Sequence, residues 1–131
     1  MPILNVKLTA PKSPELTRQV NELLLDITVR ILKKKREATA IAIDYVPQDT
    51  WSIGGVLLSD LGKHSVYFDI KITDETNTKK EKAQYIAEAF SGFERLLGEL
   101  DEKSYVYVQD VRATAYGYGG KTQEFRYFRT E

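Results

Sequence analysis

The chain has 131 residues, of which 42% are apolar and 29% are charged, a size and composition typical of one compact domain with its own core. Its 19 Lys and Arg residues balance 19 Asp and Glu residues, so no net positive field favours nucleic acid or an anionic membrane as a partner. The absence of cysteine excludes disulfides and thiolate chemistry, and indicates a reducing, cytoplasmic compartment. No apolar run reaches the roughly 18 residues of a membrane span, so we expect a soluble protein.

The first half of the sequence predicts a strand, a helix and a second strand. Apolar and polar residues alternate over 3–8, as in a half-buried strand. Ser13, Pro14 and Glu15 then supply an N-cap oxygen, a residue suited to the first helical position and a negative charge for the start of a helix. A second strand is expected over 41–46, before Pro47. The buried stripe of the helix should consist of Leu16, Val20, Leu23, Leu24, Ile27 and Ile31.

The second half repeats this order. Gly55 and Gly120 lie 65 positions apart, and the same offset places Ser13 on Thr78. Thr78 and Glu81 have the spacing of a capping box, which predicts a second helix. Strands are expected over 66–72 and 105–111, and a short edge ribbon over 124–128. The stripe of the second helix should consist of Ile86, Phe90, Phe93 and Leu97.

Two strand–helix–strand units, about 1–64 and 65–131, together predict a single α+β domain. Right-handed crossovers make the strands of each unit parallel, which gives a four-stranded mixed sheet with both helices on one face. The chain itself would leave the other face uncovered. We therefore expect self-association to bury that face.

Three features follow one another along the chain: Pro2 directly after the initiator Met1, a helix that opens with Ser13-Pro14-Glu15, and a turn with Trp51-Ser52-Ile53-Gly54-Gly55. Together they resemble the tautomerase superfamily, and the resemblance extends from Pro2 to about Gly120. The first half resembles 4-oxalocrotonate tautomerase, which is one such unit. The whole chain is similar to fused, two-unit members such as macrophage migration inhibitory factor and malonate semialdehyde decarboxylase. The resemblance implies a homotrimeric isomerase that acts on a small 2-keto or enol carboxylic acid, with no metal or organic cofactor.

The resemblance also implies that Pro2 is the general acid and base of a keto–enol tautomerisation. Once Met1 is removed, Pro2 carries a free secondary amine, whose pKa would be roughly 8 in water and lower in an apolar site. A neutral amine can take a proton beside a carbonyl and return it elsewhere. If Met1 stays attached, the nitrogen of Pro2 is an amide and cannot act as a base.

Cationic and aromatic side chains are implied for substrate binding. Lys12 occupies the position of one family arginine, while Ala40 stands where a second arginine is found. Lys71 could replace the lost charge, or could be an ordinary solvated strand lysine. Three aromatic residues complete the candidates: Trp51 as a wall of the pocket, or as a core residue, and Tyr105 and Tyr107 from the last strand.

Two further functions stay open at the level of the sequence. A decarboxylase, hydratase or dehalogenase of the same superfamily would need an additional carboxylate, which only Glu124 or Asp110 could supply. A non-catalytic protein resembling migration inhibitory factor is suggested by Ala40. The single histidine, His64, excludes a histidine cluster for a metal, and the basic run 33–36 is typical of a solvated helix end.

Overall fold

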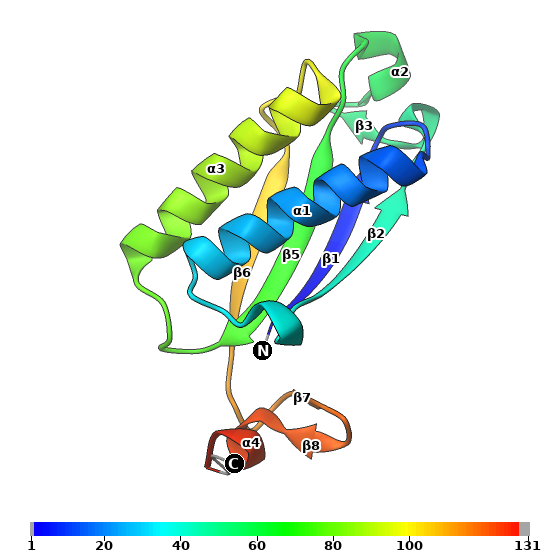
Figure 1. Ribbon diagram of the computed structural model, residues 1–131. Coiled ribbons are helices and arrows are strands. Elements are labelled where there is room, and N and C mark those ends of the chain that lie inside the picture. Colours follow the sequence, from blue (N-terminus) through cyan, green and yellow to red (C-terminus); the bar gives the residue numbers. More distant parts are fainter. Residues whose placement is uncertain (1, 129–131) are drawn as a thin grey trace.

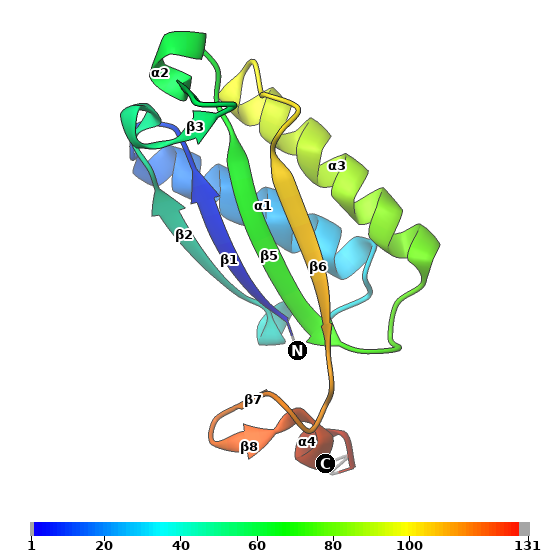
Figure 2. The same cartoon turned by 180° about the vertical axis from the view of Figure 1, so that it is seen from behind.

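A four-stranded sheet forms the centre of the molecule. The computed structural model describes residues 2–128 and orders the strands β2-β1-β5-β6, with β1 (Ile3–Leu8), β2 (Ala40–Tyr45), β5 (Val66–Thr73) and β6 (Tyr105–Val111). The strands of each unit are parallel, and β1 is antiparallel to β5. Helices α1 (Pro14–Arg30) and α3 (Lys79–Leu97) cover one face (Figure 1), and the reverse view shows the other face without helices (Figure 2). The expected mixed sheet is confirmed.

Side-chain caps start both helices at the predicted residues. Ser13 Oγ accepts a hydrogen bond from the backbone N–H of Leu16, and Pro14 occupies the first turn. The capping box is complete: Glu81 N donates to Thr78 Oγ1 at 3.1 Å, and Thr78 N donates to Glu81 Oε1 at 2.9 Å. These bonds satisfy backbone donors that have no partner inside the helix.

The core lies between the two helices and the sheet. Phe68 of β5 packs edge-on against Tyr85 and lies 6.0 Å from Phe93, measured between ring centres. The hydroxyls of Tyr85 and Thr28 lie 2.8 Å apart and join α3 to α1. The stripe predicted for α3 is wrong at Ile86, which is 40% exposed. The helix is rotated about its axis relative to the predicted orientation, so its buried residues are Tyr85, Ala89, Gly92 and Phe93.

Each unit ends in a short hairpin followed by a helical turn. In the first unit, β3 (Ser52–Ile53) pairs with β4 (Val56–Leu57) and precedes α2 (Leu58–Leu61). In the second, β7 (Gly117–Tyr118) pairs with β8 (Lys121–Thr122) and precedes α4 (Gln123–Phe128). Short 3₁₀ turns, Arg36–Ala38 and Gln48–Thr50, flank β2. We call the β3–β4 pair the first hairpin and the β7–β8 pair the second hairpin.

The two hairpins have the same turn. Gly54 and Gly119 have φ of 61° and 63°, and the glycines that follow them have φ of 81° and 79°, as a type I′ turn requires. The ribbon expected over 124–128 is wrong, because these residues belong to helix α4. Thr122 starts that helix: its Oγ1 accepts a hydrogen bond from Phe125 N at 3.0 Å.

The first strands of the two units follow a slightly different offset. Ile3 pairs with Ala40, and Tyr67 pairs with Tyr105, so β1 maps onto β5 with an offset of 64, whereas β2 maps onto β6 with 65. The second-unit residue equivalent to Pro2 is therefore Val66. No helix among residues 2–128 is long and apolar enough to cross a membrane.

Candidate active site

Pro2 lies at the edge of the sheet where β1 begins. It is buried, and its carbonyl oxygen accepts a hydrogen bond from the backbone N–H of Ala40 at 3.2 Å. This bond fixes the start of β1 against β2. Met1 lies outside the described residues.

A pocket of about 280 Å³ opens at this end of the sheet. Ile3 and Ala40 line one side, and Tyr116, Gly117 and Tyr118 line the other. The second hairpin lies below the sheet, next to the start of β1 (Figure 1). A second hollow of about 340 Å³ lies along the same hairpin, between Thr114 and Thr122. The pocket beside Pro2 is thus formed by both units of one chain, and its lining carries no charged side chain.

Tyr116 lines this pocket and carries a hydroxyl group. Its phenolic oxygen lies 2.5 Å from Oγ1 of Thr73, the last residue of β5. Burial raises the pKa of Tyr116, and the hydrogen bond to Thr73 offsets part of that rise. The phenol is therefore neutral at physiological pH and retains its proton.

Arg126 of α4 fixes the ring of Tyr118. Its guanidinium carbon lies 3.8 Å from the ring centre, and its Nη2 and Nε donate to the carbonyl oxygen of Tyr118 at 2.9 and 3.3 Å. A Cβ on Gly119 would come within 2.6 Å of Arg126 Nη2. Glycine is therefore favoured at position 119 for two reasons: the backbone is left-handed, and a side chain would collide with Arg126.

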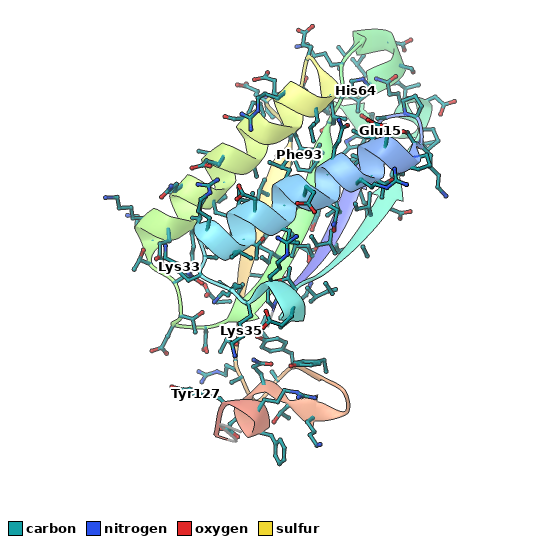
Figure 3. The ribbon with its side chains drawn as sticks, viewed as in Figure 1. Glu15, Lys33, Lys35, His64, Phe93 and Tyr127 are labelled. Atoms are coloured by element: carbon teal, nitrogen blue, oxygen red, sulfur yellow. The ribbon has the colours of Figure 1, made fainter. Side chains whose placement is uncertain are left out.

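Of the predicted cations, Lys71 lies at the Pro2 end. It pairs with Ile3, so both side chains point to the uncovered face of the sheet. Lys71 Nζ lies 2.8 Å from Oδ1 of Asp69, which is only 8% exposed. The carboxylate of Asp69 thus orients the ammonium group of Lys71 and partly neutralises its positive charge. Figure 3 places Lys35 at the same end of the molecule.

Four other candidates lie elsewhere in the chain. Lys12 and Trp51 follow the carboxyl ends of β1 and β2, roughly 20 Å from Pro2 at the rise of a β-strand. Tyr105 and Tyr107 are 62% and 59% exposed on the uncovered face, two strands away from β1. A single chain therefore does not bring these four side chains to the Pro2 pocket, and they can reach it only from another copy.

Sequence reasoning missed Tyr116, although the repeat contains the signal for it. The offset of 65 maps Trp51 onto Tyr116, and each carbonyl accepts the equivalent hydrogen bond, from Leu58 N at 2.9 Å and Gln123 N at 2.8 Å. Because β1 and β5 are antiparallel, the hairpin that ends one unit reaches the start of the other. The aromatic wall beside Pro2 thus comes from the second unit.

Comparisons with known proteins address both units. Residues 2–61 match the model of the tautomerase enzyme family. No curated protein matches the sequence. Among solved structures, R7, a wild-type fused 4-OT in an asymmetric trimer, superposes with a TM-score of 0.82 at 21% identity, over 95% of this chain and 98% of its own.

Two other solved structures show the same fold. Pt0534 inactivated by 2-oxo-3-pentynoate gives a TM-score of 0.81 at 15% identity, over 94% of this chain and 98% of its own. The macrophage migration inhibitory factor-like protein of Entamoeba histolytica gives 0.76 at 16% identity, over 92% and 97%. The likeness therefore extends through both units of the chain.

Proposed function

We propose that this protein is an isomerase that interconverts the keto and enol forms of a small carboxylic acid. Residues 2–61 match the model of the tautomerase enzyme family, and the whole chain has the fold of a fused 4-OT, as the resemblance predicts. The observation that carries the proposal is the uncharged pocket beside the start of β1. An apolar pocket disfavours an ammonium ion, so it lowers the pKa of an amine and keeps the amine neutral and able to accept a proton.

Pro2 is the proposed acid and base. With Met1 removed, its nitrogen takes the proton from the carbon next to the carbonyl, and the electron pair of that C–H bond forms the C=C bond of the enol. The π electrons of the C=O bond move onto the oxygen, which takes up a proton from water, and Pro2 gives its proton back to water, so the product is an isomer of the substrate. The reverse reaction returns the proton from the Pro2 nitrogen to carbon.

The pocket favours a substrate with one carboxylate and one apolar end. Ile3, Tyr116 and Tyr118 offer apolar surface, and Ala40 leaves open the place of a family arginine. Lys71 supplies a cation on the uncovered face. An arylpyruvate such as phenylpyruvate fits this set better than a dicarboxylate, whose second charge would be buried without a partner.

We also propose that the protein is a homotrimer. Tyr105 and Tyr107 are more than half exposed on a sheet face that no helix covers. R7 fused 4-OT forms a trimer with the same fold. A neighbouring copy would cover this face, contact residues 121–128, and could bring Lys12, Trp51, Tyr105 or Tyr107 to a Pro2 pocket. The expected cytoplasmic location remains a prediction.

The test is ketonisation of phenylenolpyruvate, followed by its ultraviolet absorbance. Protein whose intact mass shows that Met1 is absent should be active. Pro2→Ala should be slower, and a chain extended at its amino terminus should be nearly inactive. In this direction Pro2 gives its proton to carbon, so the rate should fall as pH rises through the pKa of Pro2, which lies at or below roughly 8, the pKa of a free α-amino group. Equal rates from processed and extended protein would exclude Pro2 as the base.

The hydration-type alternative has less support. Asp110 forms an ion pair with Lys82 at 2.6 Å. Glu124 is exposed on α4 and does not line the pocket. Neither carboxylate is thus positioned to activate a water molecule beside Pro2.

A further inference from the structure

We propose that the hydroxyl of Tyr116 donates a hydrogen bond to the keto or enol oxygen of the substrate, and that Thr73 holds the phenol in place for this contact. The inference rests on the proposed function and assigns the oxygen-binding group of the same pocket. It concerns a residue of the second unit acting at the start of the first.

The strand register places this hydroxyl near the start of β1. Lys71 pairs with Ile3 in the antiparallel ladder, and Thr73 lies two residues further toward the end where β1 begins. Thr73 and Lys71 are on the same face of β5. Since Tyr116 lines the pocket and its hydroxyl contacts Thr73, the phenolic oxygen lies at the end of β5, beside the start of β1.

The hydrogen-bonded pair leaves one proton available to a ligand. Either oxygen can be the donor in the contact between Tyr116 and Thr73. When Thr73 donates, the phenolic proton is free to point into the pocket. During proton abstraction by Pro2, negative charge grows on the substrate oxygen, and a donor at that oxygen stabilises the transition state more than the ground state.

The repeat has no such pair at its other end. The residues equivalent to Thr73 and Tyr116 in the first unit are Thr9 and Trp51. Thr9 Oγ1 instead accepts a hydrogen bond from Ser65 N at 2.9 Å and is buried. The hydroxyl pair is therefore specific to the end that carries Pro2, and is not a general requirement of the fold.

Kinetics of Tyr116→Phe give the first test. We expect kcat to fall about tenfold and KM to rise by a smaller factor, because the hydrogen bond is already made to the bound substrate oxygen and strengthens as negative charge grows on it. Thr73→Val should lower kcat by a smaller factor, because the phenol loses its orientation, and Thr73→Ser should retain it. The matched control is Tyr45→Phe: the Tyr45 hydroxyl lies 2.7 Å from Thr17 Oγ1, half-buried, at the opposite end of the sheet. This control should keep the wild-type kcat.

A binding experiment tests the contact without turnover. Phenyllactate carries an oxygen where phenylpyruvate has its carbonyl, and 3-phenylpropanoate lacks that oxygen. Calorimetric titration should show that the wild type prefers phenyllactate, and that Tyr116→Phe, but not Tyr45→Phe, loses this preference. Equal preference in Tyr116→Phe and the wild type would overturn the inference. If the processed wild type keeps the Tyr116-dependent preference but does not ketonise phenylenolpyruvate, the proposed function fails and the oxygen contact stands.

Discussion

Lys71 stands directly opposite Ile3 in the antiparallel pair of β1 and β5. The ammonium group of Lys71 lies 2.8 Å from Oδ1 of Asp69, which pairs with Asn5 two residues further along β1. A substrate carboxylate would therefore meet a cation whose position is already fixed, so little side-chain entropy is lost on binding.

This relationship predicts the effect of Lys71→Ala. Loss of the cation should raise KM for phenylenolpyruvate about tenfold, equivalent to roughly 1.4 kcal/mol of uniform binding, with little change in kcat. Steady-state kinetics measure both constants. Lys7→Ala, on the same face near the other end of β1, is the control and should leave KM unchanged. An unchanged KM in Lys71→Ala would assign the carboxylate to another cation.

Lys12 can act only across a subunit boundary, because its own Pro2 lies at the other end of β1. Lys12→Ala should raise KM, again by roughly tenfold. Refolding this variant together with chains extended at the amino terminus should restore a fraction of sites with the wild-type KM, because the extended chains supply Lys12. Mixtures that show only the variant's KM would exclude Lys12 from the pocket.

The two glycine turns allow a matched pair of substitutions. Ala is strained at Gly54 and at Gly119, whose φ values are 61° and 63°, but only the second hairpin lines the Pro2 pocket in the same chain. Gly119→Ala should lower kcat/KM more than Gly54→Ala, because it also displaces Arg126 from Tyr118. Thermal unfolding checks that both variants are folded. Equal losses of activity would indicate that the first hairpin contributes to a neighbour's pocket.

Glu81 should make stability depend on pH. Hydrogen bonds from the Thr78 backbone and from the Asn77 side chain lower the pKa of Glu81 in the folded protein. The unfolded chain therefore takes up a proton at higher pH, so this stabilisation is present above a pH of about 4.5 and is lost as pH falls through the lower folded pKa. Glu81→Gln should flatten the decrease in Tm between roughly pH 5 and 3. Parallel wild-type and variant curves would argue against this role.

Assembly should follow from the uncovered sheet face. Light scattering of the dilute protein is expected to give three times the mass of one chain. Replacing Tyr105 and Tyr107 together by Lys should shift the mass toward the monomer, because it places charges on that face. A monomeric wild type would contradict the proposed trimer and would leave Lys12 and Trp51 far from any Pro2.

The sequence predicts which helices, strands and turns form better than it predicts which of them lie side by side at each end of the sheet. Ser13, Thr78 and the glycine pairs are local signals, since a cap or a turn depends on a few neighbouring residues. The exposure of Ile86 depends on how α3 rotates against Phe68, which no local pattern specifies. The place of Tyr116 in the Pro2 pocket could not be predicted, because it depends on the antiparallel pairing of β1 with β5, a contact between residues far apart in sequence.

Joining two units in one polypeptide also limits where amine chemistry can occur. Val66, the counterpart of Pro2, follows Ser65 through a peptide bond, and its nitrogen donates to Ser104 Oγ at 3.2 Å. An amide nitrogen shares its lone pair with the carbonyl and cannot serve as a base. Each chain thus has a single end at which its first strand could carry a reactive amine. The opposite end, with Trp51 and Tyr105, therefore has no reactive amine of its own and could serve catalysis only by contributing side chains to a neighbouring copy.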